Sequence, residues 1–321
     1  MVGYDKEKET NILKSGIAGV FGGQITRALV CPIDVVKIRF QLQPGTVRSE
    51  LKYNGLIQAV KTIWKEESIY GFYKGHVPAQ LLSMVYGGVQ FASFEYITKA
   101  ANEIIPHSKD DHSVRSVVHF GCGCLSGAIC TLTSQPFDVV RTRFAAQKEP
   151  KQYRTVTSAI KGMYVGEGLS SFFKGLTPAL SQIIPYSGFT FCFNSLLQGL
   201  WRECSFNEAA VSGPVSHTIC GGGAGLMSKC IVYPMDVVKK RLQVQGFSEA
   251  TISEVVTYNG FRDCISTIKK QEGVRGFYKG LHVAAIKSTC TSALIFLTYE
   301  CISDFIRLLR HKVTKIKREI V

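Results

Sequence analysis

Long apolar stretches alternate with shorter polar segments along the whole chain. Six of these stretches are long enough, at about 1.5 Å per helical residue, to cross a hydrocarbon layer of roughly 30 Å. We predict long helices near residues 11 to 41, 75 to 101, 114 to 145, 175 to 202, 214 to 244 and 280 to 308. The pattern therefore predicts an all-α membrane protein with six transmembrane helices. An even number of spans places both termini on the same side.

The same pattern occurs three times. Each copy contains a motif of the form Pro-x-Asp-x-x-base-x-Arg, which begins at Pro32, Pro136 and Pro234. A later block in each copy has a glutamate before a Lys-Gly pair, and a tyrosine that opens a short amphipathic stretch lies between the two motifs. Chance does not keep several motifs at one spacing in three copies. We predict three repeats, at residues 11–105, 113–204 and 213–310, which together form one transmembrane domain.

Glycines recur thirteen and nine residues before each of the three prolines. They form GxxxG pairs at Gly19 and Gly23, Gly123 and Gly127, and Gly221 and Gly225. In membranes, GxxxG lets neighbouring helix backbones approach closely. We expect the odd-numbered helices to use these positions for close packing.

The acid and the next base of each proline motif are three residues apart, which places them on nearly the same face of a helix. These residues are Asp34 and Lys37, Asp138 and Arg141, and Asp236 and Lys239. Pairing within one helix is the simpler interpretation. Pairing between copies would instead close a pore.

Composition indicates a polar interior and favours an anionic partner. The mean hydropathy is only +0.10, which is low for helices that all face lipid. The net charge of +14 suits an anionic membrane surface, nucleic acid or a small anion, but the chain has no nucleic-acid-binding motif. His119, Cys122 and Cys124 are too closely spaced for the usual zinc pattern, so we expect no metal. The N-terminus does not resemble a signal or transit peptide.

Three bases interrupt the apolar stretches, at Arg27, Lys229 and Lys287. A charge that faces lipid costs about 3 kcal/mol on insertion scales, so these bases should face a wet interior. They have no nearby acidic partner in sequence, which favours a polyanionic substrate such as a phosphate or diphosphate. The alternative is a lysine that snorkels to an interface.

Substrate contacts are expected where the three copies differ, because an asymmetric molecule needs asymmetric contacts. Arg27, Thr131 and Lys229 share one repeat position, and Leu82, Gln182 and Lys287 share another. Tyr86 and Tyr186 also share a position, and either stacking on a heterocycle or core packing would explain them. The predicted substrate site consists of Arg27, Lys229, Lys287, Gln182, Ser83, Tyr86, Gln90 and Tyr186.

These motifs resemble the mitochondrial carrier family over nearly the whole chain. The resemblance implies three pseudo-symmetric repeats with short surface helices on the matrix side. It also implies a matrix gate of three ion pairs, Asp34 with Arg141, Asp138 with Lys239, and Asp236 with Lys37. Further implied pairs join Arg39 to Glu67, Arg143 to Glu167 and Arg241 to Glu272. The family's bracing glutamine is present as Gln41 and Gln243, whereas copy two has Ala145.

The family's cytoplasmic gate is degraded in this sequence. Two acids remain, Glu95 and Glu300, and no base occupies the motif, so only a hydrogen bond between Glu95 and Gln198 is expected. We therefore expect only weak interactions to hold the cytoplasmic gate closed.

The resemblance also implies cardiolipin binding at the glycine turns. The residues concerned are Gly55, Lys74, Gly75, Lys174, Gly175, Gly260, Lys279 and Gly280. Helix starts favour anions through free N–H groups, although ordinary glycine turns would look the same. Thr155 replaces the glycine in copy two, which puts that site in doubt.

Four stretches resemble one family member that carries a heterocyclic diphosphate. They are residues 1–5, 75–80, 86–91 and 141–147. The resemblance implies a monomeric inner-membrane exchanger without a cofactor, with both termini on the cytosolic side. A carrier for another nucleotide-like anion, an enzyme and a scaffolding membrane protein remain alternatives, although no P-loop or catalytic triad spacing is present. The sequence leaves affinity, counter-substrate and proton coupling open.

Overall fold

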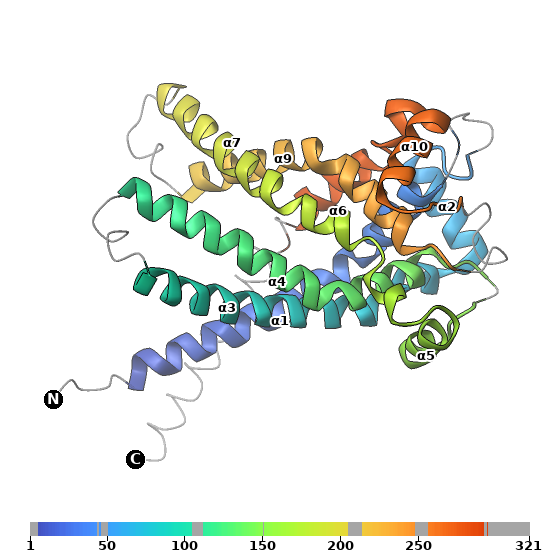
Figure 1. Cartoon of the computed structure of the whole chain (residues 1–321), viewed down its shortest axis with the longest axis horizontal. Helices are drawn as coiled ribbons and strands as arrows, with labels where there is room; N and C mark the ends of the chain where they lie inside the picture. Colours follow the sequence, from blue (N-terminus) through green and yellow to red (C-terminus); the bar gives the residue numbers. More distant parts are fainter. Residues whose placement is uncertain are drawn as a thin grey trace, which may run out of the picture.

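Long helices run side by side along the molecule in the computed structural model, with short helices gathered at one end (Figure 1). The structure describes residues 6–43, 45, 51–104, 112–149, 151–204, 214–247, 256–291 and 294. The long helices are α1 (Lys6–Leu42), α3 (His76–Ile104), α4 (His112–Ala146), α7 (Ile183–Cys204) and α9 (Pro214–Gln243), and the short α6 (Leu176–Ser181) directly precedes α7. Residues 281–291 are also helical, and the rest of the predicted sixth helix lies outside the described residues.

The predicted fourth helix is interrupted, in contrast to our expectation of one helix from 175 to 202. α6 ends at Ser181, and α7 begins at Ile183. Pro185 explains the break, because it has no N–H to donate to the Ser181 carbonyl four residues earlier. Gln182 therefore lies at the junction between α6 and α7.

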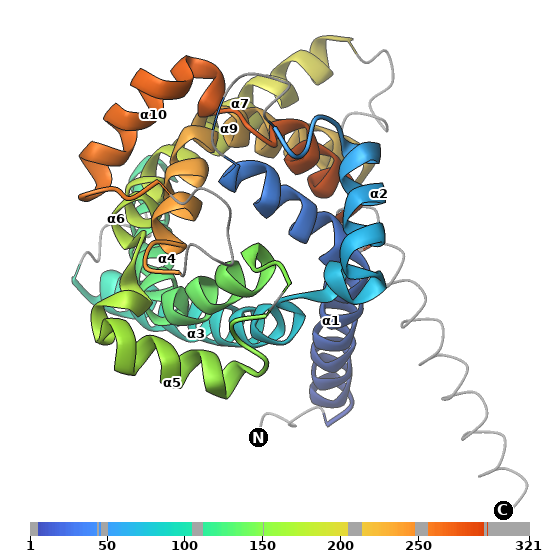
Figure 2. The ribbon, with the colours of Figure 1, turned by 90° about the vertical axis from the view of Figure 1, so that its right-hand side faces the viewer.

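Three short helices cover the ends of α1, α4 and α9 (Figure 2). They are α2 (Leu56–Glu67), α5 (Val156–Glu167) and α10 (Phe261–Gly276), and the 3-10 helices η1 (Ile69–Tyr73) and η3 (Leu169–Phe173) follow the first two. Each short helix buries one face, so α2 contributes Ala59 and Ile63 to the core. Equivalent residues of α5 and α10 pack on α4 and α9, which attaches each short helix to its own long helix. The cores beside α2 and α5 also include residues of the third copy, Val283 in the first and Val244 and Phe247 in the second.

Away from this end, the long helices turn apolar side chains outward. Phe91 on α3 and Phe191 on α7 are exposed. An apolar surface of this kind fits a lipid environment. Among the described residues, one segment, 117–146, combines the length and the mean hydropathy (1.4) typical of a membrane span. Polar and charged residues on the inner faces lower the mean hydropathy of the other long helices.

The GxxxG positions whose surroundings the structure describes do not form the close helix contacts that we expected. An added Cβ would meet nothing within 4 Å at Gly23, Gly123 or Gly225, and only ordinary contacts at Gly127, with Ile183, and at Gly221, with Asn194. Gly123 and Gly127 instead line an internal cavity. The small side chains therefore make room for a cavity.

The glycines of the Lys-Gly pairs are the ones that permit a close approach. Gly75 and Gly175 have φ of +82° and +77°, and an added Cβ would lie 2.8 Å from the Arg141 carbonyl oxygen and 2.9 Å from that of Lys239, respectively. Each turn thus packs directly on the next copy's long helix. Glycine is required there both for its backbone angle and for its size.

Ser68 should limit stability, because it has φ of 60° and ψ of −168°, a region in which glycine is normally found. Gly168 and Gly273 occupy the equivalent place in copies two and three. Ser68 is exposed, so Ser68→Gly removes strain without removing a packing contact. We expect it to stabilise the protein by about 0.5 to 1 kcal/mol after the entropy of glycine is subtracted.

The reciprocal variant Gly168→Ser is the matched control, since an added Cβ at Gly168 meets nothing within 4 Å. It should lower the melting temperature in detergent. If both variants shifted the melting temperature in the same direction, backbone strain would not be the cause.

Candidate functional site

Three acids and three bases meet where α1, α4 and α9 converge. We name this set the Asp–base ring; it consists of Asp34, Asp138, Asp236, Lys37, Arg141 and Lys239. Arg141 Nη2 lies 2.5 Å from Asp34, Lys239 Nζ lies 2.8 Å from Asp138, and Lys37 Nζ lies 3.6 Å from Asp236. Each pair joins two different copies, which confirms the predicted contacts. The ring holds the three long helices together at this end.

The two glutamines expected to brace the ring behave differently. Gln243 Nε2 donates to Asp138 at 2.8 Å, and its Oε1 accepts from Thr142. Gln41 does not brace the third pair as predicted, because its amide donates to the Tyr233 hydroxyl at 3.1 Å. Tyr233 fills the space beside Lys37, with the ammonium 5.8 Å from the ring centroid.

A second layer of ion pairs lies next to the short helices. Arg39 pairs with Glu67 and Arg241 with Glu272, each at 2.7 Å, and Arg143 pairs with Glu167. All three predicted pairs are confirmed. We name these groups, with the lysine of each Lys-Gly pair, the Glu clusters.

Each Glu cluster also caps the long helix of the next copy. Arg39 Nε donates to the Ala145 carbonyl at 3.1 Å, Arg143 Nε to Gln243 at 3.2 Å, and Arg241 Nε to Gln41 at 3.3 Å. Those carbonyls lie at helix C-termini, where intrahelical donors are lacking and the dipole favours cations. The clusters therefore link copy one to two, two to three, and three back to one.

The lysines of the Lys-Gly pairs belong to the Glu clusters, and their contact with cardiolipin stays a prediction. Lys74 Nζ lies 2.7 Å from Glu67, Lys174 Nζ 2.6 Å from Glu167, and Lys279 Nζ 2.6 Å from Glu272. Each also donates to a carbonyl of the next copy, at Gln147, Gln245 or Gln43. The positive charge of each lysine therefore neutralises a glutamate inside the protein.

The helix starts at Gly55 and Gly260 have no side-chain cap, so their first N–H groups remain open to an anion. In copy two, Thr155 Oγ1 accepts from the Ser158 N–H, and Ser158 Oγ accepts from the Thr155 N–H. The protein thus caps this helix itself.

Three glutamines that the sequence analysis overlooked connect the long helices to the loops. Gln43, Gln147 and Gln245 each donate to the carbonyl of the motif tyrosine, at Tyr53, Tyr153 and Tyr258. They stand eleven residues after each proline, so the repeat itself would have revealed them.

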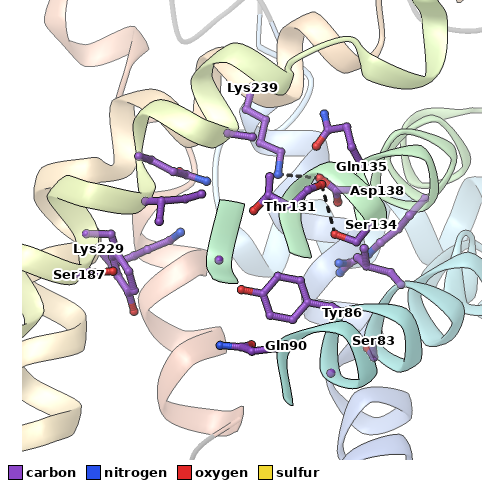
Figure 3. Close-up of a pocket in the computed structure, with 18 of the residues that line it drawn as sticks. Ser83, Tyr86, Gln90, Thr131, Ser134, Gln135, Asp138, Ser187, Lys229 and Lys239 are labelled. Carbon is purple, nitrogen blue, oxygen red and sulfur yellow. Dashed lines mark hydrogen bonds and ion pairs between the residues drawn. The ribbon is translucent and has the colours of Figure 1, made fainter. Parts of the chain in front are cut away.

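An internal cavity of about 670 Å³ adjoins the Asp–base ring. Figure 3 shows Tyr86 and Gln90 projecting from α3 on one side and Lys229 and Ser187 on another. All eight predicted substrate residues line the cavity: Arg27, Ser83, Tyr86, Gln90, Gln182, Tyr186, Lys229 and Lys287. The cavity also exposes Arg141 and Lys239 of the ring, together with Thr131, Ser134, Gln135 and Ser187.

Two of the cavity bases have acidic partners, which the sequence spacing did not suggest. Lys229 Nζ lies 2.5 Å from Asp236, and Lys287 Nζ lies 2.5 Å from Asp34. Arg27 makes a long contact of 3.4 Å with the Ala79 carbonyl. The Lys229 ammonium also lies 5.9 Å from the centre of the Tyr186 ring. Cavity bases and gate acids therefore form one charge network.

The predicted gate at the opposite end is only partly described, since Glu300 lies outside the described residues. Glu95 pairs with Lys99 at 2.7 Å on its own helix, and both side chains are exposed. This base was missed because it stands one residue beyond the motif position. The Gln198 amide donates to Asn194 Oδ1 at 3.4 Å.

Comparison with known proteins gives matches over almost the whole chain. The sequence profile described as mitochondrial carrier protein matches residues 8–103, 112–203 and 211–309. The mitochondrial thiamine pyrophosphate carrier of Bos taurus is 42% identical over 97% of this chain and 99% of its own length. The carrier of that name from Homo sapiens is 42% identical, covering 94% and 95%. The mitochondrial thiamine diphosphate carrier 2 of Zea mays is 34% identical, covering 95% and 97%.

Acid should destabilise the protein through the Glu clusters. Burial of the Glu272 carboxyl opposes ionisation, but hydrogen bonds and charge from Arg241 and Lys279 hold its pKa below the usual value. A glutamate in the unfolded chain has a pKa of about 4.3. The stabilising contribution is thus complete above about pH 4.3 and is lost as the pH falls through the folded pKa.

We expect the melting temperature in detergent to fall as the pH drops below about 4.3, and Glu272→Gln to reduce this fall. At neutral pH the same variant should lose about 3 kcal/mol, because two buried bases lose their partner. Glu66→Gln, which removes an exposed pair with Lys52, is the control. An unchanged acid response in Glu272→Gln would contradict this assignment.

Proposed function

Because the chain belongs to the mitochondrial carrier family, and is thus a transporter in a mitochondrial membrane and not an enzyme, we propose that it carries thiamine pyrophosphate across the inner membrane. The observation that carries the proposal is the cavity, which combines three bases with two tyrosines. Relatives that bear this substrate in their names support the choice.

The chemistry of this substrate matches the two kinds of side chain. Its diphosphate suits Arg27, Lys229 and Lys287, since charge-assisted hydrogen bonds to phosphate are among the stronger polar contacts. Its two heterocycles, one of them cationic, suit Tyr86 and Tyr186. Lys229 already lies near the face of Tyr186, and a cationic ring has the chemistry to take its place. A cavity of about 670 Å³ is of ordinary size for a small-molecule site.

Transport proceeds by alternating access in this proposal. The Asp–base ring closes the matrix end while the cavity is open to the intermembrane space, and both termini lie on that second side. Substrate phosphates compete with Asp34 and Asp236 for cavity bases, which couples loading to opening of the ring. Exchange for nucleotides is the proposed mode, because a nucleotide offers the same combination of phosphates and planar rings.

One chain of three repeats surrounds the pathway, which supports a monomer. Bound cardiolipin remains part of the proposal at the glycine turns, now through the backbone N–H groups near Gly55, Gly75, Gly175, Gly260 and Gly280. No other cofactor is proposed.

A carrier for another nucleotide-like anion, such as a nucleotide or a coenzyme A derivative, is the second candidate. The cationic cavity favours it equally, since bases bind phosphate whatever ring it carries. Uptake of a panel of labelled substrates into proteoliposomes separates the two. Preferential uptake of coenzyme A or nucleotides over thiamine pyrophosphate would replace the leading proposal.

Lys287→Met should raise the KM for thiamine pyrophosphate about ten- to a hundredfold, because it removes a charged contact with the diphosphate. Uptake into proteoliposomes measures this change. Lys161→Met, at an exposed position on α5, is the control and should transport normally. Unchanged transport by Lys287→Met would remove Lys287 from the site.

Tyr186 should contribute through its ring and not through its hydroxyl. Tyr186→Phe should therefore retain affinity, whereas Tyr186→Leu should raise the KM about three- to tenfold through loss of the aromatic face. The same uptake assay tests both variants. Equal losses in the two would show that the hydroxyl makes the contact.

A further inference from the structure

Each acid of the Asp–base ring contacts two cations, not one. Besides its partner in the ring, Asp34 contacts Lys287 at 2.5 Å, Asp236 contacts Lys229 at 2.5 Å, and Asp138 contacts Lys240 at 3.0 Å. We name Lys287, Lys229 and Lys240 the second cations. All three come from the third copy, so this copy supplies a charge to the acid of every repeat.

The second cations differ in their access to the cavity. The Lys229 and Lys287 side chains are 35% and 30% exposed, and both line the cavity. Lys240 is 14% exposed and is not among the described residues that line it. A ligand in the cavity therefore meets two of the second cations but not the third.

Lys240 is held by a complete set of acceptors. Its Nζ contacts both oxygens of Asp138, Thr142 Oγ1 at 2.9 Å and Gln243 Oε1 at 2.9 Å. The equivalent residues in copies one and two are Ile38 and Thr142, which carry no charge. We call the contact between two long helices at the Asp–base ring a joint, so Asp34 and Arg141 form the α1–α4 joint, and Asp138 and Lys239 form the α4–α9 joint. The arrangement around Lys240 is thus particular to the α4–α9 joint.

We propose that Lys240 is a fixed countercharge of Asp138 that keeps the α4–α9 joint of the ring closed while bound substrate loosens the α1–α4 joint. This inference rests on the proposed function, since it requires a phosphorylated anion in the cavity.

The two joints respond differently because of where their cations lie. Both cations of Asp34, Arg141 and Lys287, line the cavity, so phosphate competes with Asp34 for each of them. Asp138 itself lines the cavity, but of its two cations only Lys239 does so, and Asp138 keeps Lys240. The Gln243 amide, 2.8 Å from Asp138, adds a further contact that phosphate does not reach. The ring therefore opens first between α1 and α4, and α4 moves together with α9.

Distances between the short helices report on these joints, because each short helix packs on its own long helix. Lys61, Lys161 and Ser266 are equivalent exposed positions on α2, α5 and α10. Nitroxide labels on genetically encoded residues at pairs of these positions allow pulsed EPR in liposomes. Thiamine pyrophosphate should lengthen the 61–161 distance and leave the 161–266 distance unchanged. Equal lengthening of both distances would overturn the proposal.

Without ligand, Lys240→Thr should broaden the 161–266 distances and leave the 61–161 distances as they are. Lys240→Arg should restore the wild-type distribution. Lys240→Thr should also leave the KM for thiamine pyrophosphate within about twofold of wild type, in contrast to Lys287→Met, because Lys240 makes no substrate contact. An unchanged 161–266 distribution, or a KM raised as in Lys287→Met, would overturn the role of Lys240.

The ligand-free comparison separates this inference from the proposed function. If the wild type does not transport thiamine pyrophosphate, the proposed substrate fails, whereas the effect of Lys240→Thr without ligand still decides whether Lys240 holds the joint. Lys240→Thr introduces the residue of copy two, which favours normal folding. The melting temperature of Lys240→Thr in an Asp138→Asn background gives an independent measure, and an undiminished loss there would contradict pairing with Asp138.

Discussion

Buried carboxylates need matching cations, and the arrangement of the whole protein follows from this requirement. Asp34, Asp138 and Asp236 are only 6 to 8% exposed. Taking such charges out of water costs several kcal/mol each, and removing one partner is more damaging than removing both. Since the ring partner of each acid stands on another copy, α1, α4 and α9 cannot separate unless another anion or water replaces these contacts. In the proposed function the transported anion is such a replacement, which places substrate recognition and closure in one electrostatic network.

The repeat located the charged residues that obey symmetry, although it was not used to find Gln43, Gln147 and Gln245. The family resemblance implied how Asp34, Asp138, Asp236 and the three glutamates pair, and the structure has all six pairs. The cavity residues were also found, because positions that break the repeat were taken as candidates. Sequence spacing failed where partners come from different helices without a repeated pattern, as with Lys287 and Asp34. It also failed at Gln41, because nothing in the sequence indicated that Tyr233 would occupy its hydrogen bond.

Two motifs have neighbours in the fold that the sequence did not reveal. The lysines of the Lys-Gly pairs were assigned to cardiolipin binding, because the family resemblance places an anion at these helix starts. The neighbouring glutamate is a closer and already buried anion, so it takes the charge. The GxxxG glycines were expected to bring helices together, yet Gly123 leaves room for a cavity. In both cases the motif is present in the sequence, and the residues that surround it in the fold determine which contacts it makes.

Each Glu cluster caps the long helix of the next copy, so the caps form a closed circle of three copies. This circle has a consequence for assembly of the protein. The carbonyls at the end of α1 are capped by Arg241 and Lys279, which lie about two hundred residues later in the chain. The first copy therefore acquires these caps only when the third copy packs against it. A chain that stops before Lys279 therefore loses the contact of that lysine with the Gln43 carbonyl but keeps Arg241, which caps Gln41.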